Sequence, residues 1–227
     1  MRLVWRAALV HVFTALGAVC ALFAMSAVIA GAWEQVFIWL GIALIIDGLD
    51  GTFARITKVA ECLPRFSGER LDLVIDYVTY VFIPAFALLQ AGYLSGPVGM
   101  LLASLILLSS LFHFSDTESK TEDYSFVGFP AIWNIVAFYA FAFHMPSWLA
   151  GALVLVCVAL TFVPLPWAHP LRTPGLWPMT FGLTALWCIA ALFTISSGFP
   201  ASRMEQIVYV VAAAYGLVLA LLRRRSA

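Results

Sequence analysis

Four aspartates lie between residues 47 and 76 in two pairs with helical spacing. Asp47 and Asp50, in IIDGLDGTFAR, are three positions apart, and Asp72 and Asp76, in GERLDLVIDYV, are four apart. Residues three or four apart share one face of a helix. Carboxylate oxygens are the ligands that Mg²⁺ and Mn²⁺ prefer in proteins. The pattern predicts a site for two divalent metal ions that bind a phosphate-bearing substrate.

Small and basic residues beside the aspartates favour a diphosphate as the ligand. Gly51 and Ala54 let a ligand approach the helix backbone closely. Arg55 adds a cation that suits a diphosphate. A structural polar cluster or a proton path is the alternative for the aspartates, but charged residues inside membrane spans generally serve function.

Long apolar segments must position these residues. Hydrophobic residues make up 63% of the 227-residue chain and charged residues only 11%, whereas a soluble domain has roughly 25% charged residues. The apolar runs are about 20 residues long, enough to cross a bilayer core of about 30 Å, so we expect an all-α, polytopic membrane helical bundle. Eight spans are predicted, at about 9–30, 35–56, 72–94, 98–115, 127–145, 148–166, 178–197 and 204–222. No internal repeat is visible, which favours a single membrane domain over residues 1–227.

The distribution of positive charge predicts the orientation in the membrane. An even number of spans places both termini on the same side. With the N-terminus inside, the outside segments hold only Arg203 of the 12 lysines and arginines, and the inside segments hold the other 11. Lysine and arginine favour the cytoplasmic side. We therefore expect both termini and the aspartates to face the cytoplasm, in the inner (cytoplasmic) membrane of the cell.

The motifs resemble the signature of a known family. Asp47-x2-Asp50-Gly51-x2-Ala54-Arg55, followed by Gly68-x3-Asp72-x3-Asp76, is similar to the motif of the CDP-alcohol phosphotransferases. Twelve residues separate the arginine from the second glycine, which is more than the family usually has. The longer loop fits the bacterial phosphatidylcholine synthase branch. DYVTYVFIPAFALLQ, TEDYSFVGFPAIWN and FVPLPWAHPLR also resemble that branch.

The resemblance implies roles for individual residues. The four aspartates would bind two Mn²⁺ or Mg²⁺ ions, and Asp76 would also be the general base. The small motif residues and a polar pair on the first span, His11 and Thr14, would form the CDP-lipid pocket, with His11 where relatives more often have Asn. Arg172 is either a further diphosphate ligand or a lipid-headgroup anchor. The predicted CDP-lipid-binding residues are His11, Thr14, Asp50, Gly51, Ala54, Arg55, Gly68 and Arg172.

Acidic and aromatic residues favour choline as the acceptor. A quaternary ammonium binds aromatic faces and negative potential, and residues 116–126 carry four acids against one lysine. Apart from Arg172, no extra basic cluster is present for an acceptor that carries a phosphate. Any one of the aromatic residues is alternatively an interfacial anchor, and the acidic segment a solvated loop. The candidates are Tyr80, Glu122, Asp123, Tyr124, Phe129, Trp133 and Asn134.

The resemblance therefore implies transfer of a phosphatidyl group from CDP-diacylglycerol to choline, with release of CMP. The expected partners are these two substrates, membrane lipids and a second copy of the chain, since relatives are often homodimers. Nucleic-acid binding has no support. One alternative is a different small-alcohol acceptor, such as serine, inositol or ethanolamine. A cation-coupled transporter is a more distant alternative, because transporters often show repeats and midplane sites.

Overall fold

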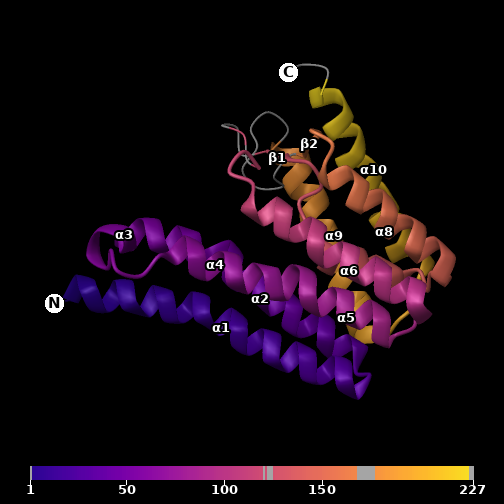
Figure 1. Cartoon of the computed structure of the whole chain (residues 1–227), viewed down its shortest axis with the longest axis horizontal. Helices are drawn as coiled ribbons and strands as arrows, with labels where there is room; N and C mark the ends of the chain where they lie inside the picture. Colours follow the sequence, from indigo (N-terminus) through magenta and orange to yellow (C-terminus); the bar gives the residue numbers. More distant parts are fainter. Residues whose placement is uncertain (1, 120, 122–124, 168–176, 225–227) are drawn as a thin grey trace.

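A computed structural model describes residues 2–119, 121, 125–167 and 177–224, and these residues are almost entirely helical. The helices are α1 (Arg2–Ala30), α2 (Trp33–Thr57), α3 (Val59–Cys62), α4 (Gly68–Asp76), the π-helix η1 (Tyr77–Phe82), α5 (Ile83–Gln90), α6 (Gly96–Ser115), α7 (Trp133–Ala142), α8 (Ser147–Thr161), α9 (Trp177–Ser197) and α10 (Arg203–Arg224). Two short strands, β1 (Phe126–Val127) and β2 (Pro166–Trp167), pair antiparallel. The all-α prediction is confirmed (Figure 1).

Six helical segments of the described chain are long and apolar enough to cross a membrane. They are Val4–Ala30, Trp33–Ile56, Gly68–Gln90, Gly96–Ser115, Pro178–Ser197 and Arg203–Arg223. Each overlaps one of the predicted spans. The third begins earlier than predicted, because Ser67 caps α4 by accepting a hydrogen bond from the Arg70 N–H at 3.2 Å. The protein is thus a multi-pass membrane protein.

The apolar segments predicted at 127–145 and 148–166 form shorter helices. Before α7, Gly128 and Ala131 have positive φ angles of 76° and 54°, which no helix accommodates. A Cβ on Gly128 would lie 2.4 Å from the Thr161 carbonyl oxygen, so this close crossing requires glycine. Beyond the end of α8, Pro164 precedes β2 and Pro166 is its first residue. Hydropathy alone does not show where the backbone of an apolar segment stops being helical.

Four turns gather at one end of the molecule, on the right of Figure 1. The Ser147 hydroxyl donates to the Gly92 carbonyl at 3.1 Å and joins the α7–α8 turn to the α5–α6 turn. The Ala201 N–H donates to the Ala142 carbonyl at 2.9 Å and adds the α9–α10 turn. In that turn Gly198 lies beside the Glu34 carboxylate at the start of α2. The helices on either side of each turn therefore run in opposite directions.

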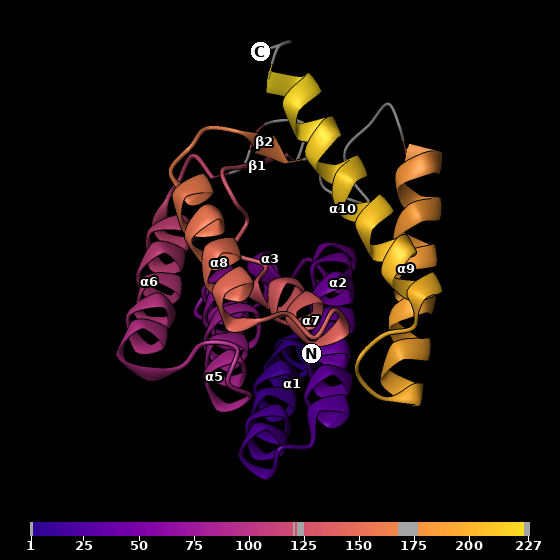
Figure 2. The ribbon, with the colours of Figure 1, turned by 90° about the vertical axis from the view of Figure 1, so that its right-hand side faces the viewer.

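Aromatic side chains form the centre of the core. Phe37 of α2 packs against Phe138 and Phe141 of α7 and against Phe199, with ring centroids 5.2–5.3 Å apart. Tyr209 of α10 is fully buried and packs edge-on against Phe138 at 5.4 Å. Figure 2 shows α9 and α10 as a pair beside the other helices. The pair is attached to the bundle through side chains of α7 and through contacts of α9 with α2 and of α10 with β2.

Helices α1, α2 and α4 carry the predicted metal ligands and the described CDP-lipid-binding residues. α1 packs along α2, and it approaches α4 so closely that a Cβ on Gly17 would lie 2.6 Å from Ile75 Cγ2. Lys58 ends α2 in the left-handed conformation, with φ 50°. The chain then forms α3 and a short loop before α4 begins. This connection keeps the ends of α2 and α4 close together.

Candidate active site

Three of the four predicted metal ligands form one cluster. One carboxylate oxygen from each of Asp47, Asp50 and Asp72 lies within 4.8 Å of the other two. Oxygen ligands of Mg²⁺ or Ca²⁺ lie about 2.0–2.6 Å from the ion, so opposite ligands are at most about 5 Å apart. Asp50 is only 6% exposed. The geometry and the donor atoms fit a divalent metal ion, and we call this cluster the acidic triad.

Asp76, the fourth predicted ligand, lies beside the acidic triad. It is the last residue of α4, and its Oδ1 atom is buried. Four positions along a helix advance about 6 Å, so Asp76 follows Asp72 on the side away from the start of α4. This position suits a group that acts next to a bound ion.

Tyr80 also reaches the acidic triad. Its hydroxyl donates to Asp47 Oδ2 at 2.7 Å. Tyr80 belongs to η1, one turn after Asp76, and it was predicted from the sequence to contact choline. The structure shows its hydroxyl bonded to a predicted metal ligand.

A cavity of about 820 Å³ opens next to the acidic triad. Two triad members, Asp50 and Asp72, line it. Its walls contain every described residue predicted to bind the CDP-lipid, namely His11, Thr14, Asp50, Gly51, Ala54, Arg55 and Gly68. Arg172 lies outside the described residues. The structure therefore brings the predicted nucleotide residues and the metal ligands together in one site.

His11 presents an unused polar atom inside this site. Its Nε2 is buried and has no hydrogen-bond partner among the described residues. The ring lies edge-on to Phe66, with centroids 6.4 Å apart, and a Cβ on Gly68 would lie 3.3 Å from His11 Cε1. A buried polar atom without a partner costs about 1–3 kcal/mol. A ligand group that bonds to Nε2 would remove that cost.

The long connection between α2 and α4 forms the outer wall of the cavity, a role that sequence analysis missed. The wall residues are Lys58, Val59, Ala60, Glu61, Pro64, Phe66 and Ser67. Val59 packs against Ala7 and Val10, which fixes α3 to α1. The only signal in the sequence was the extra length of this connection.

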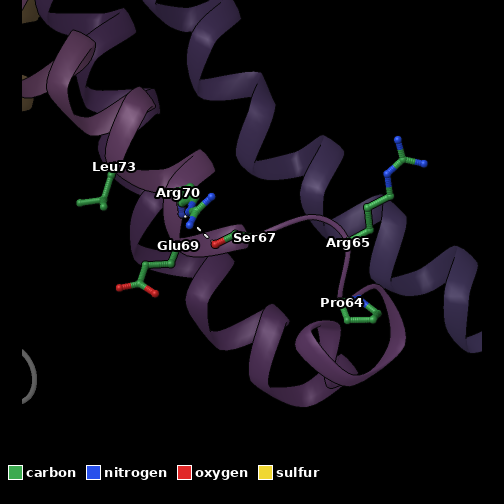
Figure 3. A pocket seen from close by; sticks show the side chains of 6 residues that line it. All are labelled: Pro64, Arg65, Ser67, Glu69, Arg70 and Leu73. Carbon is green, nitrogen blue, oxygen red and sulfur yellow. Dashed lines mark hydrogen bonds between the residues drawn. The ribbon is translucent and has the colours of Figure 1, made fainter.

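A second cavity of about 520 Å³ adjoins the same connection. It is lined by Pro64, Arg65, Ser67, Glu69, Arg70 and Leu73 (Figure 3). In Figure 3 the Arg65 guanidinium points away from Arg70, and Glu69 lies on the other side of Arg70. The two arginines do not converge on a common point, so this cavity does not offer a paired contact to an anion.

Of the other residues predicted for choline, the described ones, Phe129, Trp133 and Asn134, do not line either cavity. Trp133 is fully buried, donates to Ser110 Oγ at 2.7 Å, and packs edge-on against Phe129 at 5.0 Å. Asn134 is buried, and its Oδ1 accepts a hydrogen bond from the Ile135 N–H at 2.9 Å. Glu122, Asp123 and Tyr124 lie outside the described residues.

Comparison with known proteins identifies relatives that extend over most of the chain. The chain is 42% identical to the phosphatidylcholine synthase of Mesorhizobium japonicum over 202 residues, which are 89% of this chain and 75% of that protein. It is 39% identical to the phosphatidylcholine synthase of Rhizobium johnstonii over 210 residues (92% and 87%). It is 33% identical to the one from Borreliella burgdorferi over 209 residues (91% and 89%). No family model matches the chain.

Proposed function

Because the chain belongs to the phosphatidylcholine synthase family, we propose that it transfers the phosphatidyl group of CDP-diacylglycerol to choline and releases CMP. The observation that carries this proposal is that Asp50 and Asp72 belong to the acidic triad and also line the larger cavity. The sequence motif that contains the four aspartates, Gly51, Ala54, Arg55 and Gly68 supports membership of the wider group of CDP-alcohol phosphotransferases.

The larger cavity is proposed to hold the cytidine diphosphate part of the lipid. Its volume of about 820 Å³ falls in the range of about 300–1,000 Å³ that is usual for small-molecule sites. His11 and Thr14 would bond to the base or the ribose, and Gly51 leaves room beside the α2 backbone. Arg55, exposed at the edge of the cavity, would pair with the diphosphate.

In the proposed mechanism the four aspartates hold two divalent ions, Mn²⁺ or Mg²⁺. When bound, such ions polarise a phosphate and neutralise the leaving group. Asp50 and Asp72 would hold an ion at the cavity wall, and Arg55 would orient the diphosphate there. Asp76 accepts the hydroxyl proton of choline while the choline oxygen forms a bond to the lipid-side phosphorus. The bond from that phosphorus to the CMP oxygen breaks, and phosphatidylcholine and CMP leave.

The acceptor site is proposed to include the acidic and aromatic residues Glu122, Asp123 and Tyr124. Carboxylates and an aromatic face suit a quaternary ammonium, which offers no hydrogen-bond donor on its charged end. Burial of Phe129, Trp133 and Asn134 supports a packing role for these three.

We propose that α7 and α8 also cross the membrane, which gives eight spans. The gathered turns support this, because they make consecutive helices antiparallel. α7 is only about 15 Å long, but its buried surroundings satisfy the rule that non-helical backbone at membrane depth must be enclosed by protein. With the charge asymmetry of the loops, this arrangement puts both termini and the active site on the cytoplasmic side of the inner membrane.

The deciding experiment is transfer of labelled choline by the purified protein, supplied with CDP-diacylglycerol and Mn²⁺. We expect equal amounts of phosphatidylcholine and CMP, and no product after addition of a chelator. Turnover with serine, inositol or ethanolamine but not choline would keep the transferase and overturn the acceptor. No turnover with any alcohol, in protein shown to be folded, would contradict the proposal.

A further inference from the structure

One hydrogen bond to the acidic triad has no role in the reaction described above. Tyr80 donates to Asp47 Oδ2 at 2.7 Å across 33 positions of sequence, from η1 to α2. Asp50 and Asp72 line the larger cavity, whereas Asp47 and Tyr80 are not among the described residues that line it. The bond therefore lies on the side of the acidic triad away from the cavity wall.

A local irregularity of the helix accompanies this contact. Asp72, Asp76 and Tyr80 follow one another at four-residue intervals, so they lie along one side of the segment Gly68–Gln90. Between Tyr77 and Phe82 this segment is π-helical. Pro84 has no N–H to donate to the carbonyl of Tyr80 four residues earlier, which interrupts the α-helical pattern there. Single π turns inside α-helices are frequent at functional sites.

The bond has a clear physical effect on Asp47. Three carboxylates as close as those of the acidic triad repel one another, and Asp47 can turn away from the other two. A hydrogen bond from a neutral hydroxyl to a carboxylate stabilises the carboxylate without adding charge. The bond uses Oδ2 of Asp47 and leaves Oδ1 to bind an ion. Outer partners of this kind typically change metal affinity by about 10–100-fold.

We propose that Tyr80 is a positioning residue of the divalent-ion site, and that its hydroxyl fixes the orientation of Asp47 and thereby sets the affinity for the metal. This role concerns the hydroxyl of Tyr80, and contact of its aromatic face with choline stays a prediction. The expected effect of Tyr80 on turnover rests on the proposed function. The effect on metal binding does not, because it is measured without either substrate.

The test is Tyr80→Phe, which removes only the hydroxyl. Mn²⁺ binding to the purified protein without substrate, followed by the electron paramagnetic resonance signal of the free ion, should weaken about 10–100-fold. In choline transfer, the Mn²⁺ concentration that gives half the maximal rate should rise by a similar factor. At saturating Mn²⁺ both the rate and the choline KM should return to those of the unmodified protein.

Tyr77→Phe is the matched control. Tyr77 lies in the same π-helix, but its hydroxyl donates to the Leu107 carbonyl of α6 at 3.2 Å. We expect this variant to bind Mn²⁺ normally. Unchanged Mn²⁺ affinity in Tyr80→Phe, equal losses in both variants, or a rise in choline KM alone would overturn the proposal. A specific loss of Mn²⁺ binding in a protein that transfers no alcohol would support the role of Tyr80 and contradict the proposed function instead.

Discussion

At the scale of single residues, Asp76 differs from the acidic triad by its position. The triad carboxylates converge within 4.8 Å, whereas Asp76 follows one turn later with Oδ1 buried. A carboxylate next to an ion site, close to the attacking hydroxyl, is suited to proton transfer. The sequence motif groups all four aspartates together, and the structure separates the one that we assign as the base.

Asp76→Asn tests that assignment. The amide keeps an oxygen that can bind a metal ion but does not accept a proton, so Mn²⁺ and CDP-lipid binding should persist. Choline transfer should fall by at least about 100-fold, the lower end of what proton transfer contributes. Binding by calorimetry and product formation by radiolabel measure the two properties separately. Normal turnover would remove Asp76 as the base.

His11→Phe tests the buried ring nitrogen in the larger cavity. Phenylalanine keeps the edge-on packing with Phe66 and loses Nε2. Loss of one hydrogen bond worth about 1.4 kcal/mol weakens binding about tenfold, so the KM for CDP-diacylglycerol should rise by that factor with little change in kcat. His11→Asn, which retains a polar group, is the control and should stay near the unmodified value. An unchanged KM in His11→Phe would exclude a contact to the nucleotide.

Residue spacing was sufficient to predict which side chains meet, but not every bond they make. Asp47, Asp50 and Asp72 meet because helical periodicity and a connection that folds back place them on facing sides of α2 and α4. The bond from Tyr80 depends on the rotation of η1, and the wall that contains Phe66 depends on how the connection folds back on α1. Neither follows from periodicity, since both arise from contacts between segments.

At the scale of helices, the contact between α1 and α4 holds two walls of the site together. α1 carries His11 and Thr14, and α4 carries Asp72. Gly17 allows the two helices to touch, because a Cβ there would lie 2.6 Å from Ile75 Cγ2. The branched side chain of isoleucine has little rotational freedom in a helix and does not move aside easily.

Gly17→Ala should therefore push α1 and α4 apart. We expect a loss of about 1–3 kcal/mol in stability from overpacking, together with reduced turnover. Thermal unfolding in detergent and the choline-transfer assay measure the two effects. Gly41→Ala on α2, where nothing lies within 4 Å of the added Cβ, is the control and should be neutral.

A second substitution checks the cause of this effect. Ile75→Ala in the Gly17→Ala background removes the clashing methyl group, so the combined loss should be smaller than the sum of the two single losses. Simple addition of the two losses would contradict a direct clash between these residues.

At the scale of the whole molecule, sequence analysis predicted the order of the apolar segments, and the structure adds how they are joined. Six long helices match six predicted spans. The short lengths of α7 and α8 were not predictable, because Gly128 and Ala131 leave the helical conformation only where this stretch crosses the end of α8. The gathered turns at one end then give α7 and α8 their direction.

Cysteine labelling tests the proposed eight spans. In a background without native cysteines, Pro146→Cys in the α7–α8 turn should react with an impermeant maleimide in intact cells. Arg65→Cys, in the connection at the opposite end, should react only after the cells are permeabilised. Both positions are exposed. Protection of position 146 in intact cells would mean that α7 and α8 do not cross the membrane.

The shortness of α7 has a consequence for how the enzyme is made. Its ten residues are enclosed by Phe37 of α2 and, from the α9–α10 hairpin, by Phe199 and Tyr209. The ribosome makes that hairpin after α7, so α7 leaves the ribosome before this part of its surroundings exists. A nascent chain that ends after α8 would contain all four aspartates yet lack the packing that holds its centre. Packing around α7 is then completed by a hairpin that lies far along the chain from the residues that do the chemistry.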